Sequence, residues 1–101
     1  MGIYTNLANN DGEMGIVKSV LDSITRIQHG VSYEAGWWDE VDHLDPNVKA
    51  AKMCLMHSEI SEAMEGMRKD LMDDKLPHRK MEEVELADVL LRIFDYAGRY
   101  N

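Results

Sequence analysis

Hydrophobic positions recur at three- and four-residue steps in three stretches of the chain, and no stretch shows the apolar–polar alternation that is typical of a strand. In the first stretch the apolar residues follow Asn10 or Asp11, either of which can cap a helix, and the pattern continues until Gly30. We expect this glycine to end the helix. The repeating residues of this stretch are Val17, Val20, Leu21, Ile24 and Ile27.

Two further helices are expected in the second half of the chain. One begins at Asp45, an N-cap residue followed by Pro46 at the first helical position, and runs to about Asp70. The last helix follows the segment KLPHRK and continues nearly to the end of the chain. The sequence therefore predicts an all-α chain.

A long aromatic segment, VSYEAGWWDEVDHLD at residues 31–45, separates the first two helices. Connections of this length within a compact domain are usually functional or disordered. The adjacent tryptophans Trp37 and Trp38 argue against disorder, so we expect this loop to have a functional role.

Composition places the chain among soluble globular proteins. Of its 101 residues 45% are hydrophobic and 30% are charged, which predicts one domain spanning residues 1–101. The formal net charge of −8 argues against a nucleic-acid partner, because phosphate contacts need a basic surface. Cys54 is the sole cysteine, so an intrachain disulfide is excluded. The sequence shows neither a signal peptide nor an apolar run of bilayer length, so we expect no membrane contact and a cytoplasmic location.

The last predicted helix is apolar around most of its circumference, and two other helices of the same chain cannot cover all of it. We therefore expect a homo-oligomer in which helical hairpins from different protomers form a four-helix-bundle core. The apolar residues of this helix are Leu86, Ala87, Val89, Leu90, Leu91, Ile93, Phe94 and Ala97.

The middle helix has a methionine-rich face beside an acidic one. Glu59 and Glu62 flank the methionine-rich face, whereas Glu65 points away from it and is expected in solvent. The stripe that we expect in the core consists of Met53, Met56, Ile60, Met64 and Met67.

The last helix has a narrow polar strip formed by Glu85, Asp88 and Arg92. Two antiparallel helices can bring Glu85 and Asp88 to face Glu59 and Glu62. Four ionised carboxylates beside a core are unfavourable unless a cation neutralises them, and hard divalent cations such as Mg²⁺ prefer oxygen ligands of this kind. The simpler alternative is a pair of acidic helix faces neutralised by Arg and Lys side chains.

The pattern Glu59-x-x-Glu62, followed on the next helix by Glu85-x-x-Asp88, resembles the signature of the MazG-like, all-α nucleoside triphosphate pyrophosphatases. The segments KMCLMHSEISEAMEGMRKD and HRKMEEVELADVLLRIFDYAGRY resemble the small single-module members found in integron cassettes, and the resemblance covers roughly the second half of the chain. It implies Mg²⁺-dependent hydrolysis, with Mn²⁺ as a substitute, of ribo- or deoxyribonucleoside triphosphates to monophosphate and pyrophosphate, a house-cleaning activity. It also implies dimers, or tetramers built as dimers of dimers, with sites at the subunit interface.

Roles for individual residues follow from this resemblance. The four carboxylates would hold the cation, and Glu59 or Glu62 would also accept a proton from the attacking water. Trp37 and Trp38 are candidates for stacking on the base. Basic side chains would bind the triphosphate, with charge pairing at helix ends as the alternative. These basic candidates are Lys52, Lys69, Lys75, Arg79 and Arg92.

Two other interpretations of the sequence stay open. A non-catalytic interaction or regulatory module with an acidic metal-binding face would use the methionine-rich surface to bind a partner. A carboxylate-bridged di-metal oxidase is suggested by Glu40 and His43, which form an E-x-x-H motif. Such oxidases need two of these motifs on helices, and the chain has no second copy.

Overall fold

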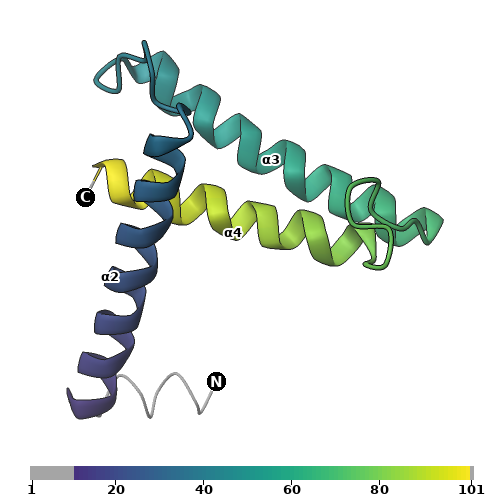
Figure 1. Ribbon diagram of the computed structural model, residues 1–101, viewed down its shortest axis with the longest axis horizontal. Coiled ribbons are helices and arrows are strands. Elements are labelled where there is room, and N and C mark those ends of the chain that lie inside the picture. Colours follow the sequence, from purple (N-terminus) through teal and green to yellow (C-terminus); the bar gives the residue numbers. More distant parts are fainter. Residues whose placement is uncertain (1–10, 101) are drawn as a thin grey trace.

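The computed structural model describes residues 11–100, which form three helices: α2 (Asp11–Glu34), α3 (Pro46–Lys69) and α4 (Met81–Tyr100) (Figure 1). The all-α prediction is therefore confirmed. Within the described range the only strand-like pairing is a single antiparallel bridge between Met72 and Lys80 in the connection between α3 and α4. Asn10, one of the two predicted caps of the first helix, lies outside the described residues.

The prediction that Gly30 ends the first helix is wrong. The helix passes through Gly30, where an added Cβ would meet no atom within 4 Å, and continues to Glu34. The chain leaves the helix at Gly36, whose φ of 89° lies in the left-handed region that glycine adopts most readily. A glycine ends a helix where the backbone turns left-handed, and only the second of these glycines does so.

Both predicted ends of α3 are confirmed. The Asp45 side chain accepts a hydrogen bond of 2.8 Å from the backbone N–H of Asn47, and Pro46 occupies the first turn. At the other end Asp70 adopts a left-handed conformation, with φ and ψ both 51°, and its backbone N–H donates to carbonyls of the last turn. These caps place α3 so that it faces α4 across the short connection at residues 70–80.

The central helix of the fold is α4, which packs against both other helices, whereas α2 and α3 do not pack against each other. Figure 1 shows α3 and α4 running side by side as a hairpin, with α2 crossing the C-terminal end of α4. Glycines permit both contacts. An added Cβ at Gly66 would lie 2.7 Å from the Cβ of Met81, and one at Gly98 would overlap the Cβ of His29.

The face of α3 that packs on α4 differs from the predicted one. The residues of α3 that are buried are Glu59, Ala63 and Gly66, so small side chains and one carboxylate form the contact with α4. Most of the methionine-rich stripe is turned outward, since Met56 is half-buried and its other members are exposed, so the stripe does not form the core of the chain. Hydrophobicity indicated that this stripe is buried somewhere, but the small residues beside it decide which face can approach α4 closely.

A continuous surface of exposed apolar side chains results, which we call the outer apolar face. On α3 and on α4, each residue of this face comes directly after a residue that packs against the other helix. Ile60 follows the buried Glu59 on α3, and Leu90 follows the buried Val89 on α4. In an antiparallel pair this offset turns both stripes to the same side of the hairpin, away from Glu85 and Asp88. The face consists of Met53, Ile60, Met64, Met67, Leu86, Leu90 and Ile93, all of them exposed.

The described part of the chain has a small hydrophobic interior. The buried apolar side chains in the described range are Trp38, Ala63 and Val89. The radius of gyration of the Cα atoms is 16.3 Å, whereas a compact domain of about 100 residues has about 13 Å. Among residues 11–100, no helix combines the length and the apolar character that a membrane span requires.

Candidate functional site

Three carboxylates from the two hairpin helices converge at one point. Glu59 of α3 and Glu85 and Asp88 of α4 each offer one oxygen atom, and these three oxygens lie within 4.8 Å of one another. No other group of three or more His, Cys, Asp or Glu side chains within residues 11–100 meets this condition. The predicted convergence of α3 and α4 carboxylates is therefore present for three of the four residues. Glu62 lines the same cavity but lies outside the trio.

The trio carries an uneven distribution of charge. A hydrogen bond with Glu59, together with burial, raises the pKa of Glu85 to about 8. The same contact with Glu85 lowers the pKa of Glu59, and the nearby Arg92 guanidinium lowers it further. Burial, followed by the charge of Glu59, raises the pKa of Asp88. At neutral pH Glu59 is therefore the ionised member of the pair and Glu85 holds a proton.

The trio opens into a cavity of about 630 Å³ between the hairpin helices and the loops at either side. Ligand-binding cavities in proteins commonly measure about 300–1,000 Å³. Its wall brings together carboxylates, two cations and one indole. The polar and aromatic residues of this wall are Trp37, Glu59, Glu62, Asp73, Asp74, Lys75, Glu85, Asp88 and Arg92.

Two of the five predicted basic residues, Lys75 and Arg92, line this cavity. The guanidinium of Arg92 donates to Oε1 of Glu59 from both Nε, at 3.0 Å, and NH2, at 2.9 Å. The charge of Lys75 also acts on Asp88, because it lowers the pKa that burial raises. Both residues combine positive charge with proximity to the carboxylates.

The other three basic residues lie elsewhere. Lys69 pairs with Glu65 on the exposed side of α3, as expected for a solvated glutamate, and Arg79 pairs with Glu83. Lys52 donates to the Trp37 carbonyl at 3.4 Å, and its Nζ lies 4.2 Å from the centre of the Trp38 ring. Charge pairing or loop support accounts for each of these three side chains.

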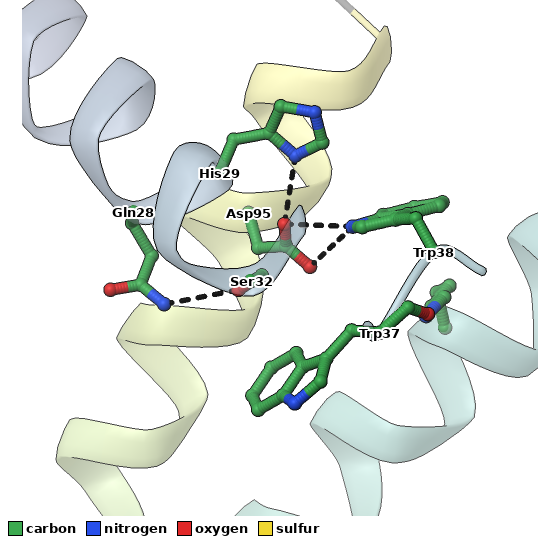
Figure 2. A network of polar contacts seen from close by, with 7 residues as sticks. Gln28, His29, Ser32, Trp37, Trp38 and Asp95 are labelled. Carbon is green, nitrogen blue, oxygen red and sulfur yellow. Dashed lines mark hydrogen bonds and ion pairs between the residues drawn. The ribbon is translucent and has the colours of Figure 1, made fainter. Parts of the chain in front are cut away.

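The two adjacent tryptophans occupy different environments (Figure 2). Trp38 is 6% exposed, and its Nε1 donates to Oδ1 of Asp95 at 2.9 Å and to Oδ2 at 3.2 Å. Nδ1 of His29 lies 2.9 Å from Oδ1 of the same carboxylate. Trp37 is 44% exposed and lines the cavity, with its ring centre 5.5 Å from the Arg92 guanidinium. The structure therefore places Trp37 at the candidate site and Trp38 in the core.

Two aspartates at the cavity were not identified from the sequence. Asp73 and Asp74 belong to the connection between α3 and α4, and Asp73 is buried. Oδ2 of Asp73 accepts from the backbone N–H groups of Lys75, at 3.0 Å, and Leu76, at 2.8 Å. An aspartate that caps the turn following it is a recognisable local signal, and here it fixes the loop that carries Lys75.

The E-x-x-H motif of the aromatic loop does not form part of a metal-ligating group. Nδ1 of His43 lies 2.9 Å from NH2 of Arg99, and Glu40 adopts a left-handed conformation in the turn before it. The one group of residues 11–100 whose geometry could hold a metal ion is the carboxylate trio, which contains no histidine. The geometry gives no support to a di-metal oxidase centred on this loop.

Comparison with protein-family models, curated proteins and solved structures finds no match for the chain.

Proposed function

We propose that the chain is a Mg²⁺-dependent nucleoside triphosphate pyrophosphohydrolase that converts ribo- or deoxyribonucleoside triphosphates to monophosphate and pyrophosphate. One observation carries the proposal. The three convergent oxygens of Glu59, Glu85 and Asp88 lie in the wall of a cavity that also presents a cation and an exposed indole. A triphosphate needs a metal site, positive charge for its remaining oxygens and a surface for its base, and this cavity offers all three.

The residues present fit a hard divalent cation. Oε2 of Glu85 is buried and has no hydrogen-bond partner, which is a costly condition for a carboxyl oxygen. A cation bound to the Glu85 carboxylate through this oxygen would supply that partner and would displace the proton that Glu85 otherwise holds. Mg²⁺ and Mn²⁺ both prefer carboxylate and phosphate oxygens, in agreement with an all-carboxylate donor set.

When bound, the cation would neutralise charge on the phosphate oxygens and lower the pKa of a coordinated water. Glu62 is the better placed base, because it lines the cavity outside the trio, whereas Glu59 is held by Arg92. In this scheme Glu62 accepts a proton from the attacking water as the water oxygen bonds to one of the two phosphorus atoms of the α–β linkage. The bond from that phosphorus to the oxygen that bridges the α- and β-phosphates breaks, and monophosphate and pyrophosphate separate.

Lys75 and Arg92 would bind the phosphate oxygens, and Trp37 would stack on the base. Stacking on an indole has little base preference, which suits an enzyme that accepts several nucleotides. Lys52, Lys69, Arg79 and Trp38 take no direct part in this scheme, because each is occupied by another contact away from the cavity.

A second copy of the chain is the proposed occupant of the outer apolar face. Seven large apolar side chains are exposed on one side of the hairpin, and an extended exposed apolar surface marks an interaction site. A face made of Met, Leu and Ile is complementary to itself, and two hairpins packed through it would form the four-helix core of a dimer. Dimers could then pair to a tetramer.

The outer apolar face also favours a second candidate, a non-catalytic module that binds another protein through this surface. The two candidates differ in what the carboxylates do. In a binding module, replacement of Asp88 by Ala would leave stability unchanged or improved, with no dependence on Mg²⁺, since it removes a carboxylate that is disfavoured by burial and by the charge of Glu59. Glu59 does not separate the candidates in this way, because its loss also leaves Arg92 without its partner.

The test is pyrophosphate release from a panel of canonical and modified ribo- and deoxyribonucleoside triphosphates, with and without Mg²⁺. We expect Mg²⁺-dependent release that Glu59→Ala abolishes and Glu62→Gln reduces by about 100-fold or more. Glu65→Gln is the matched control on the same helix, because Glu65 is partly exposed, paired with Lys69 and outside the cavity. Folded protein that releases no pyrophosphate from any substrate would refute the proposal in favour of the binding module.

A further inference from the structure

Arg92 contacts both chemically distinct parts of the cavity. Its Nε and NH2 both reach Oε1 of Glu59, and both side chains are largely buried. The same guanidinium lies 5.5 Å from the centre of the Trp37 ring, within the range of about 6 Å in which a cation is attracted by an indole face. One side chain therefore joins the carboxylate trio to the exposed indole.

The backbone that carries Trp37 is held independently of Arg92. The backbone N–H of Trp37 donates to the Ser32 carbonyl at 3.1 Å, and its own carbonyl accepts from Lys52. The next residue, Trp38, is fixed to Asp95 on α4, and Figure 2 shows the two indoles diverging from this anchored segment. A change at the Trp37 ring can thus arise from its neighbour Arg92 without movement of the loop.

A divalent cation held by the trio and Arg92 would compete for the same carboxylate, that of Glu59. Each bond that Glu59 forms with a cation weakens its attraction for the guanidinium, and the reverse holds by linkage. A guanidinium released from Glu59 remains beside Trp37 in a cavity that also contains Lys75, where phosphate oxygens would be its next partners.

We propose that Arg92 couples cation binding at Glu59 to the environment of the Trp37 indole, so that the metal site and the base-stacking surface are assembled together. The inference rests on the metal site of the proposed function, and it assigns Arg92 as a positioning residue for Trp37 in addition to its phosphate contact.

The test combines tryptophan fluorescence with calorimetric titration of Mg²⁺ into the full chain at constant ionic strength. We expect Mg²⁺ to shift the emission of the wild type, and Trp37→Phe to abolish the shift while Mg²⁺ still binds. Arg92→Gln should abolish the shift and bind Mg²⁺ about fivefold or more tightly, because the competing cation is removed. Arg79→Gln is the matched control, since Arg79 is exposed and outside the cavity.

Arg92→Lys keeps the positive charge but lacks the two N–H donors that reach Glu59, so Mg²⁺ should still shift its tryptophan emission, by less than in the wild type. It also provides a second variant that is expected to fold. Mg²⁺ binding without a change of Trp37 emission, or an unaltered shift and affinity in Arg92→Gln, would overturn the coupling and leave the metal site intact. A wild type that binds no Mg²⁺ by calorimetry would overturn the coupling and the metal-dependent function together.

Discussion

The indole nitrogen of Trp38 donates to both carboxylate oxygens of Asp95, a residue of α4 that is only 3% exposed. Through this contact the aromatic loop is attached to the same helix that provides Glu85 and Asp88. The loop therefore delivers one tryptophan to the protein interior and the adjacent one, Trp37, to the cavity. A buried carboxylate with charge-assisted partners is well satisfied only while these partners remain.

Replacement of the two tryptophans separates their roles. Trp38→Phe removes the indole donor from Asp95 and should lower the free energy of unfolding by about 1–3 kcal/mol. Trp37→Phe alters an exposed ring and should change it by no more than about 0.5 kcal/mol. Urea denaturation of both variants in parallel checks the expectation. Equal losses from the two substitutions would contradict the assignment of Trp38 to the core and Trp37 to the cavity.

Two glycines within helices should respond in opposite directions to the same substitution. Gly98→Ala would push a Cβ into His29 and to within 3.0 Å of the Thr25 carbonyl oxygen, so α2 must move away from α4. We expect a net loss of about 1–3 kcal/mol from this overpacking. Gly30→Ala meets open space in the middle of α2 and should gain up to about 1 kcal/mol in helix propensity. Thermal unfolding of both variants distinguishes the cases, and a stabilised Gly98→Ala would mean that α2 does not pack closely on α4.

Positions on a helical wheel predicted the carboxylate cluster well, because the placement of residues on one face of a helix depends only on their spacing in the sequence. Glu85 and Asp88 had to share a strip of α4, and a hairpin had to turn this strip toward α3. The wheel could not predict which face of α3 turns toward α4. That choice depends on Ala63 and Gly66, whose small size permits close approach, whereas hydrophobicity gave more weight to the neighbouring methionines.

The same limit applies to the loop and the basic residues. Adjacent tryptophans must point in different directions, but only the position of Asp95 on the folded α4 decides that Trp38 is the buried one. Likewise Lys75 and Arg79 lie only four positions apart in the same connection, and the turn capped by Asp73 brings only Lys75 to the cavity. Contacts between residues far apart in the chain fix these details, and a single sequence contains no record of them.

The proton that Glu85 holds and shares with Glu59 in a hydrogen bond predicts that the free energy of unfolding depends on pH in the absence of metal. Folding raises the pKa of Glu85 from 4.5 to about 8, chiefly through its hydrogen bond with Glu59. A raised folded-state pKa gives stability that is fully present below pH 4.5 and is lost as the pH rises through about 8. In EDTA, the free energy of unfolding should therefore fall between about pH 5 and about pH 8.5.

Glu85→Gln removes this titration and should flatten the profile in that range, whereas Glu65→Gln should follow the wild type. Mg²⁺ should restore stability at the alkaline end, because the cation takes the place of the lost proton. Glu59 acts in a different range, since its lowered pKa gives stability that is lost only in acid. Denaturant unfolding at a series of pH values is the measurement, and a wild-type profile that rises toward alkaline pH would disprove the shared proton.

The proposed dimer through the outer apolar face predicts that a single charge on this face separates the two copies. Leu90→Glu places a carboxylate in the middle of this face and should convert the assembled wild type to a monomer that keeps its three helices. Leu44→Glu is the matched control, because Leu44 is 77% exposed but lies in the loop before α3, away from the face. Light scattering coupled to size-exclusion chromatography gives the mass of each species. A wild type that is monomeric at all concentrations, or an unchanged mass for Leu90→Glu, would contradict a self-associating face.

A monomeric Leu90→Glu that also loses pyrophosphate release, while Leu44→Glu retains it, would show that the cavity needs residues from the second protomer.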